Sequence, residues 1–137
     1  MITALDHVGL SVADLEAAGA FYAAAFDFQP EFPFTLGDTG IRGVMLRHPA
    51  GHRLELFQAP SSREGLRAAT PIEALGTRGY GHVALAAPDI EAPFTRALQA
   101  GARTLVAPGP SPEPGVRFAF LADPEGNLVE LVERTGA

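Results

Sequence analysis

The chain has 137 residues, no cysteine and a formal net charge of −6, and all ten of its positively charged side chains are arginines. These numbers exclude disulfides, thiolate nucleophiles, cysteine-ligated metal sites and a Schiff-base lysine, and without a basic run a nucleic acid is not an expected partner. The length suits one domain, and the sequence has neither a signal-type N-terminus nor an apolar run long enough to cross a bilayer, so we expect a soluble cytoplasmic protein.

The first half of the chain predicts a strand, a helix and three further strands. The segment "ALDHVGLSV" (4–12) alternates with the period of two that is typical of a half-buried strand. Asp14 then offers an N-cap for a helix that starts in "LEAAGAFYAAAF" (15–26). Pro-x-Gly in "HPAGH" indicates a hairpin turn between the last two of the three strands, which we expect over about 28–36, 41–48 and 53–59.

The second half repeats this order after a linker, residues 60–78, that has room for a short helix. "YGHVALAA" (80–87) predicts a strand, and Asp89 is expected to be the N-cap of a helix in "IEAPFTRALQA" (90–100) that ends at Gly101. "DPEGN" is the hairpin turn here, between the last two of three strands expected over about 103–107, 115–122 and 127–134.

A single offset of 75 residues relates the two halves. It aligns His7 with His82 and Glu55 with Glu130, and it needs no gap from His7 to Gln58. Such self-similarity indicates two copies of one structural unit. We therefore expect one domain over residues 1–137, with an α+β fold of two tandem βαβββ modules: module 1 at about 1–59 and module 2 at about 79–137.

Four side chains stand out because strand alternation puts them on the face that does not pack on the helix. They are the first-strand imidazoles His7 and His82 and the last-strand carboxylates Glu55 and Glu130. Two imidazoles and two carboxylates suit one first-row divalent cation, whether Zn, Ni, Co, Mn or Fe, and two carboxylates neutralise such a dication. The alternative is that each histidine is a hydrogen-bonded core residue and each glutamate lies on a solvated face.

The same alternation predicts the surroundings of these four groups. Arg47 and Arg53 can bind a carboxylate or phosphate of a substrate, although exposed strand arginines would show the same pattern. Three apolar side chains are expected to line the pocket, namely Met45, Phe118 and Phe120. His48 and His52 flank the first Pro-x-Gly turn, and we interpret them as surface turn residues.

The doubled module, with "LDHVGLSVADLEAA", "YGHVALAAPDIEA" and "FLADPEGNLVELVE", resembles the vicinal oxygen chelate superfamily. That superfamily includes glyoxalase I, methylmalonyl-CoA epimerase, extradiol dioxygenases and bleomycin-binding proteins. The resemblance implies a curved, barrel-like mixed sheet with the helices outside, and a homodimer. It also implies one divalent metal held by His7, Glu55, His82 and Glu130, the ligand pattern of glyoxalase I and the epimerase.

The resemblance further implies a shared chemistry, in which the metal chelates neighbouring oxygens of a small carbonyl substrate. We expect a lyase or isomerase that moves a proton through an enolate-like intermediate, with Glu130 or Glu55 as the base. Glu130 is favoured because Arg53 should hold Glu55 ionised in place. An Fe(II) extradiol-type dioxygenase and a non-catalytic ligand-binding or resistance protein are the alternatives.

Overall fold

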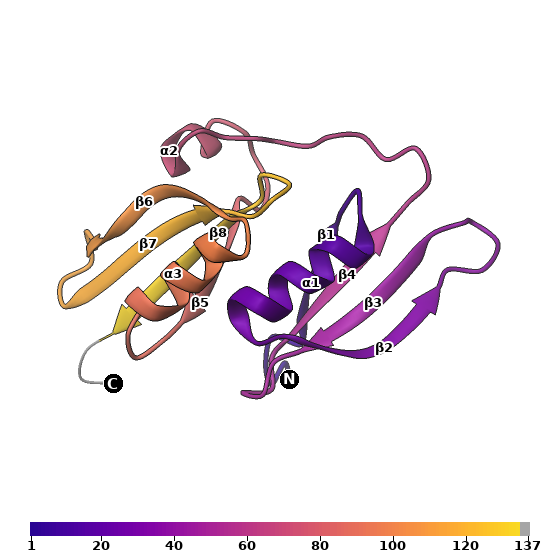
Figure 1. Ribbon diagram of the computed structural model, residues 1–137, viewed down its shortest axis with the longest axis horizontal. Coiled ribbons are helices and arrows are strands. Elements are labelled where there is room, and N and C mark those ends of the chain that lie inside the picture. Colours follow the sequence, from indigo (N-terminus) through magenta and orange to yellow (C-terminus); the bar gives the residue numbers. More distant parts are fainter. Residues whose placement is uncertain (135–137) are drawn as a thin grey trace. The chain divides into compact units, whose positions relative to one another are not determined.

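The computed structural model describes residues 1–134, and the chain divides into two compact units, Met1–Glu64 and Gly65–Ala137. The first unit contains β1 (His7–Ser11), α1 (Leu15–Phe26), β2 (Gln29–Thr35), β3 (Arg42–Arg47) and β4 (Arg53–Gln58). The second contains α2 (Pro71–Ala74), β5 (His82–Ala86), α3 (Glu91–Gln99), β6 (Arg103–Pro110), β7 (Val116–Ala122) and β8 (Leu128–Arg134) (Figure 1). The expected order of strand, helix and three strands is confirmed in both.

Each unit has its own four-stranded mixed sheet. The strand orders are β1-β4-β3-β2 and β5-β8-β7-β6, and the first strand runs parallel to the last in each unit while the other pairs are antiparallel. The eight strands of the described part thus form two separate sheets rather than one closed barrel. In this arrangement the strands that carry the histidine and the glutamate of each module are direct neighbours.

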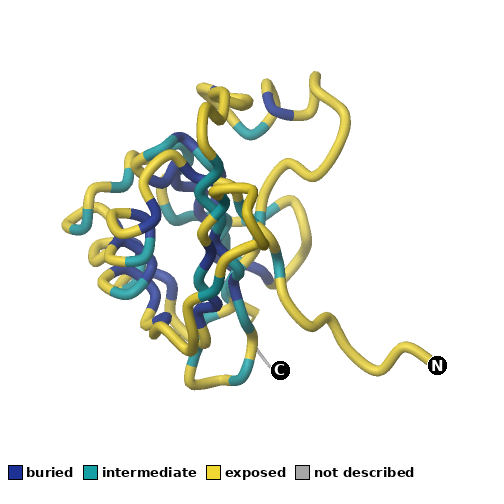
Figure 2. The backbone as a smooth tube through the Cα atoms, turned by 90° about the vertical axis from the view of Figure 1, so that its right-hand side faces the viewer, coloured by how far each residue is buried: buried dark blue, intermediate teal, exposed yellow. Residues whose placement is uncertain are grey.

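The helix of each unit covers one face of its sheet (Figure 1), and this face holds the core. Leu56 in β4 and Leu131 in β8 are fully buried, whereas the neighbours Glu55 and Glu130 are only partly buried because strand side chains alternate between faces. The N-terminal residues and most of the linker are exposed (Figure 2). No described helix is long and apolar enough to cross a membrane.

The two helices begin differently. Asp14 is the N-cap of α1 as predicted, and its carboxylate accepts a hydrogen bond from the Ala17 N–H at 3.0 Å. The prediction that Asp89 is the N-cap of α3 is wrong by one residue, because Ile90 takes that position without a side-chain bond. Ile90 already has helical dihedral angles, so the Asp89 carboxylate reaches the Glu91 N–H only two residues on, at 2.9 Å, in an Asx-type turn.

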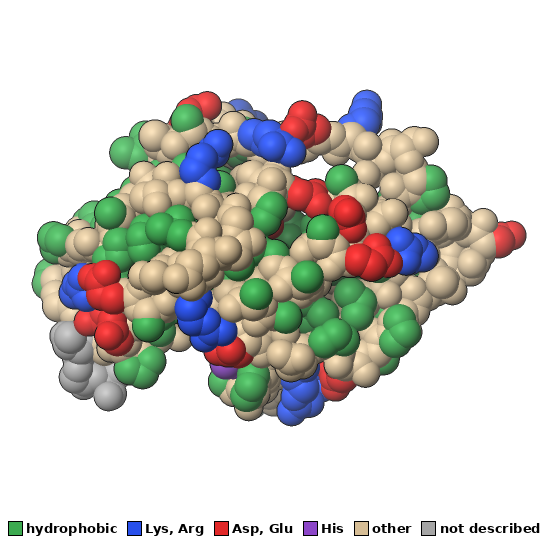
Figure 3. Space-filling model, viewed as in Figure 1, with side chains coloured by type: hydrophobic (Ala, Val, Ile, Leu, Met, Phe, Trp, Pro, Cys, Tyr) green, Lys and Arg blue, Asp and Glu red, His purple; other side chains and the backbone are tan. Residues whose placement is uncertain are grey.

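An ion pair between the helix and the third strand recurs in both units. Arg42 contacts Glu16 at 2.8 Å, and Arg117 contacts Glu91 at 2.7 Å, and these pairs are related by the 75-residue offset. On the face shown in Figure 3, arginine side chains lie beside acidic ones. Exposed ion pairs contribute little stability. Their recurrence nevertheless shows that the repeat extends to side-chain contacts.

Gly19 lies in the middle of α1 and lines an apolar groove between α1 and strands β2 and β3, with a cavity volume of about 680 Å³. A Cβ added to Gly19 would meet no atom within 4 Å. We expect Gly19→Ala to raise the free energy of unfolding by about 0.5–1 kcal/mol, because glycine inside a helix loses more backbone entropy than alanine. Urea unfolding measures the change.

Gly51 provides the matched control for this prediction. A Cβ added to Gly51 would also meet no atom within 4 Å, but the φ of +106° lies in the region that favours glycine. Gly51→Ala should therefore destabilise the protein. Equal effects of the two substitutions, or destabilisation by Gly19→Ala, would contradict the explanation.

Candidate functional site

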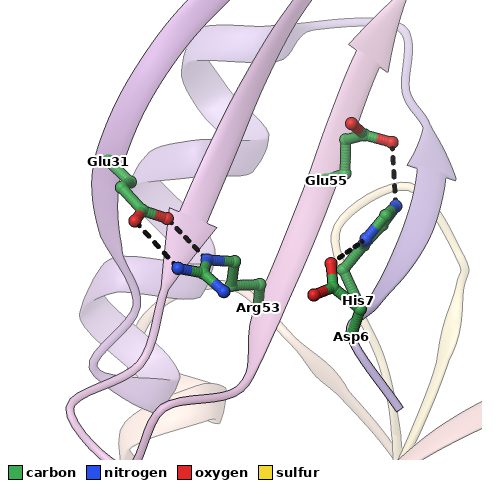
Figure 4. A network of polar contacts seen from close by, with 5 residues as sticks. All are labelled: Asp6, His7, Glu31, Arg53 and Glu55. Carbon is green, nitrogen blue, oxygen red and sulfur yellow. Dashed lines mark hydrogen bonds and ion pairs between the residues drawn. The ribbon is translucent and has the colours of Figure 1, made fainter. Parts of the chain in front are cut away.

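The first module brings His7 and Glu55 together on one face of its sheet. β1 and β4 are adjacent and parallel, with His7 opposite Arg53 and Gly9 opposite Glu55. The His7 Nε2 atom lies 3.3 Å from Glu55 Oε1, and the two side chains are 36% and 20% exposed. Figure 4 shows both groups extending toward each other from neighbouring strands. A Cβ added to Gly9 would lie 3.8 Å from the Phe57 ring and 4.0 Å from Glu55 Oε1, so a larger residue at this position would contact the carboxylate.

The second module repeats the pair. His82 Nε2 lies 3.1 Å from Glu130 Oε2, and the side chains are 38% and 20% exposed. The His82 ring also packs edge-on against Phe120, with ring centroids 5.0 Å apart. The separations differ by a fraction of an ångström and the exposures match, so the repeat predicted from the sequence includes the geometry of these two polar pairs.

Each pair fits two ligands of one cation. Two ligand atoms that each lie about 2.1 Å from a metal and subtend a right angle at it are about 3 Å apart, close to both observed separations. Imidazole nitrogen and carboxylate oxygen are ligands that first-row divalent metals accept. Among the described residues of each unit, no group of three or more His, Asp or Glu side chains that could hold a metal is found.

Asp6 is a polar neighbour of the site that the sequence patterns did not single out. Its carboxylate oxygen Oδ2 lies 2.7 Å from Nδ1 of His7. This hydrogen bond, reinforced by the charge of Glu55 and opposed by partial desolvation, raises the pKa of His7. The side chain of Asp6 is 74% exposed. The position of a carboxylate directly before the first-strand histidine could have identified Asp6 from the sequence.

Arg53 and Arg47 both contact Glu31 of β2. The Arg53 guanidinium makes two hydrogen bonds to the Glu31 carboxylate, at 2.7 and 3.1 Å, and Arg47 lies 3.6 Å from it. Figure 4 shows Arg53 turned toward Glu31 and away from Glu55. The prediction that Arg53 holds Glu55 in place is therefore wrong, because strand parity fixes the face of a side chain but not its partner.

Met45 and Phe120 occupy equivalent positions beside the two carboxylates. In the antiparallel pairing Met45 is opposite Glu55, and Phe120 is opposite Glu130. Residues opposite each other in a sheet point to the same face. Both side chains are largely buried, so each glutamate has an apolar neighbour that reduces its contact with water.

The linker covers part of this face in the second unit. Ala68 and Ala74 are buried in one cluster with Phe120 and Leu128, and Phe118 packs against it. The helix α2, which begins after Thr70, holds Ala74 in position. The linker thus makes Phe120 part of a core, and no sequence pattern indicated this because the contacting residues lie about 50 positions apart.

His48 and His52 lie at the hairpin turn as predicted, and their rings stack 4.4 Å apart. Both rings also pack in a T-shaped arrangement with the buried Phe28 ring, with centroids 5.5 and 5.3 Å from it. The Nδ1 atom of His48 accepts a hydrogen bond from the Ala50 N–H at 2.9 Å. Burial, and secondarily the charge of His48, lowers the pKa of His52.

The lowered pKa of His52 predicts an acid-sensitive contribution to stability. The folded state binds the proton less readily than the unfolded state, so this contribution is present above the ordinary histidine pKa of about 6.5 and is lost as the pH falls below it. In metal-free protein, His52→Gln should show a smaller drop in melting temperature than the parent between about pH 7.5 and about pH 5.5. An identical pH dependence would contradict the prediction.

Comparison with known proteins identifies the family. The model of the Glyoxalase/Bleomycin resistance protein/Dioxygenase superfamily matches residues 4–131. A search of the curated proteins gives no match.

Three solved structures illustrate the similarity. A mutant of glyoxalase I from Zea mays is 26% identical with a TM-score of 0.76; the match covers 94% of this chain but only 45% of the maize protein. A glyoxalase family protein from Bacillus cereus is 22% identical (TM-score 0.79, covering 99% and 97% of the two chains). A glyoxylase/bleomycin resistance protein/dioxygenase domain from Frankia sp. is 18% identical (TM-score 0.79, covering 98% and 99%).

The last two likenesses concern the fold alone, and the chain spans less than half the length of the maize enzyme. The match to the family model identifies the family, because it includes both modules, from the segment before β1 into β8. The chain belongs to the Glyoxalase/Bleomycin resistance protein/Dioxygenase superfamily.

Proposed function

We propose that the protein is a divalent-metal-dependent enzyme of the glyoxalase or epimerase type. The observation that carries this proposal is the repeated imidazole–carboxylate pair, His7 with Glu55 and His82 with Glu130, at nearly equal separations. These four side chains would hold one Zn, Ni, Co, Mn or Fe ion, either within one chain or between two chains. Glyoxalase I among the similar structures supports this choice of enzyme class.

The proposed substrate class is the one that the family resemblance implies, and the ligand set is compatible with it. A bound dication supplies a Lewis acid for neighbouring oxygens of a small carbonyl compound. Glu55 or Glu130 takes the proton from the carbon next to the carbonyl and returns it, so that the product differs from the substrate in the position or configuration of that hydrogen. Met45 and Phe120 limit the access of water to the carboxylates.

Elemental analysis after dialysis against each of the five metals tests the first part of the proposal. We expect about one ion per set of four ligands and a higher melting temperature with metal, because a ligand that binds only the folded state stabilises it. A protein that stays metal-free with unchanged melting in all five would refute it.

Solvent deuterium incorporation into a panel of α-hydroxy ketones and 2-oxo aldehydes tests the second part. Exchange at the carbon beside the carbonyl supports the proton-transfer reaction. Metal-dependent oxygen consumption with catechols, without exchange, would instead identify a dioxygenase.

We also propose that the protein acts as a homodimer with a small-molecule substrate, in keeping with the family resemblance. Sedimentation should then give a particle of twice the chain mass of 14.3 kDa at micromolar concentration. A single species of the chain mass would reject the dimer.

A further inference from the structure

The two imidazoles of the site are held in different ways, although the modules are otherwise equivalent. The Nδ1 atom of His7 is hydrogen-bonded to the Asp6 carboxylate at 2.7 Å. The residue at the equivalent place before His82 is Gly81, which has no side chain. His82 instead rests against the Phe120 ring, whose counterpart near His7 is Met45. A carboxylate therefore directly precedes the histidine in the first module and not in the second.

The contact determines which nitrogen of His7 carries the proton. A carboxylate is only an acceptor, so the hydrogen between Asp6 and His7 resides on Nδ1. In the neutral ring the other nitrogen, Nε2, then has a free lone pair. That lone pair faces Glu55 Oε1 at 3.3 Å. Both atoms offer a lone pair toward the space between them, so a cation placed there would be attracted by both.

We propose that Asp6 is a positioning residue that keeps the Nδ1–H form of His7, so that the Nε2 lone pair points toward the same place as the Glu55 carboxylate. A carboxylate that accepts from the remote nitrogen of a ligating histidine also orients the ring. Figure 4 shows the three groups in line, with His7 between Asp6 and Glu55. The consequence for metal binding rests on the proposed function, but the effect on the ring does not.

Asp6→Ala and Asp6→Asn test this inference, with Asp38→Ala as the control. The asparagine oxygen still accepts a hydrogen bond but carries no charge, and Asp38 is an exposed carboxylate in the turn between β2 and β3. The ¹⁵N shifts of labelled histidine rings are read in metal-free protein at a pH where His7 is neutral. Calorimetric titration with Zn²⁺ then gives the metal affinity.

We expect Asp6→Ala to increase the Nε2–H form of His7 and to weaken Zn²⁺ binding by about 10–100-fold. Asp6→Asn should restore most of the parent tautomer ratio and affinity, and Asp38→Ala should match the parent in both. A parent-like tautomer ratio in Asp6→Ala overturns the inference. If the parent binds no Zn²⁺, the proposed function fails, whereas the NMR result still decides the role of Asp6.

Gly81→Asp provides a test in the opposite direction. Gly81 does not have a positive φ, and a Cβ there would meet no atom within 4 Å, so the backbone accepts the substitution. The added carboxylate should increase the Nδ1–H form of His82 in the metal-free protein. An unchanged His82 ring would show that a preceding carboxylate does not set the tautomer, and would count against the inference.

Discussion

His7→Ala and His82→Ala should each weaken metal binding by more than about 100-fold, because loss of a direct ligand exceeds the 10–100-fold cost of losing its supporting contacts. Thermal unfolding measures the effect directly. At a metal concentration 100 times the parent dissociation constant, the parent should gain about 2.7 kcal/mol of stability. A variant with 100-fold weaker binding should gain only about 0.4 kcal/mol.

His48→Ala is the control for these variants, because it also removes one imidazole from the first module but from the hairpin turn, where His48 stacks on His52. It should retain the full stabilisation by metal. His7 and His82 are both more than a third exposed, so neither substitution should prevent folding. Full metal stabilisation in both site variants would rule out these histidines as ligands.

The fold could be predicted because the sequence contains two copies of the same pattern of structural signals. The first-strand, N-cap and hairpin-turn signals of the first half recur 75 residues later, so an assignment that is ambiguous in one module is supported by the other. The strand alternation also indicated the correct face for the two histidines and the two glutamates. The pairing of each histidine with its own module's glutamate follows from β1 lying beside β4, and β5 beside β8.

The side-chain partners could not be predicted in the same way. Arg53 lies on the same strand face as Glu55, yet it binds Glu31, a residue of β2. The choice depends on the reach of a long side chain and on the register across three strands, which no local pattern encodes. The packing of Ala68 and Ala74 onto Phe120 has the same origin, since it depends on the path of the linker.

Two element boundaries differ from those predicted, namely the start of α3 and the end of β6. The strand expected over about 103–107 continues to Pro110 as β6. The added residues include Pro108 and Pro110, which β6 accommodates because it is an edge strand with register irregularities before Val106 and Gly109. Neither this extension nor the shifted start of α3 moves a residue of the candidate site.

Glu130→Gln and Glu55→Gln should separate metal binding from catalysis. Glutamine keeps the size of glutamate and one oxygen ligand, but it cannot accept a proton at neutral pH. The variant of the catalytic base should keep measurable metal and lose turnover by about 10²–10⁴-fold, the usual contribution of general acid–base catalysis. Metal content and deuterium exchange are measured on the same preparations, with Glu113→Gln, an exposed carboxylate paired with Arg134, as the control.

The comparison of the two variants also decides which carboxylate is the base. A preference for Glu130 depended on Arg53 anchoring Glu55, and Arg53 is bound to Glu31 instead. The two glutamates are equally exposed, and each has a histidine and a buried apolar side chain as neighbours. They differ at the adjoining strand, where Gly9 stands beside Glu55 and Ala84 beside Glu130. If both glutamine variants exchange deuterium at the parent rate with full metal, neither carboxylate is the base and the proton-transfer mechanism is wrong.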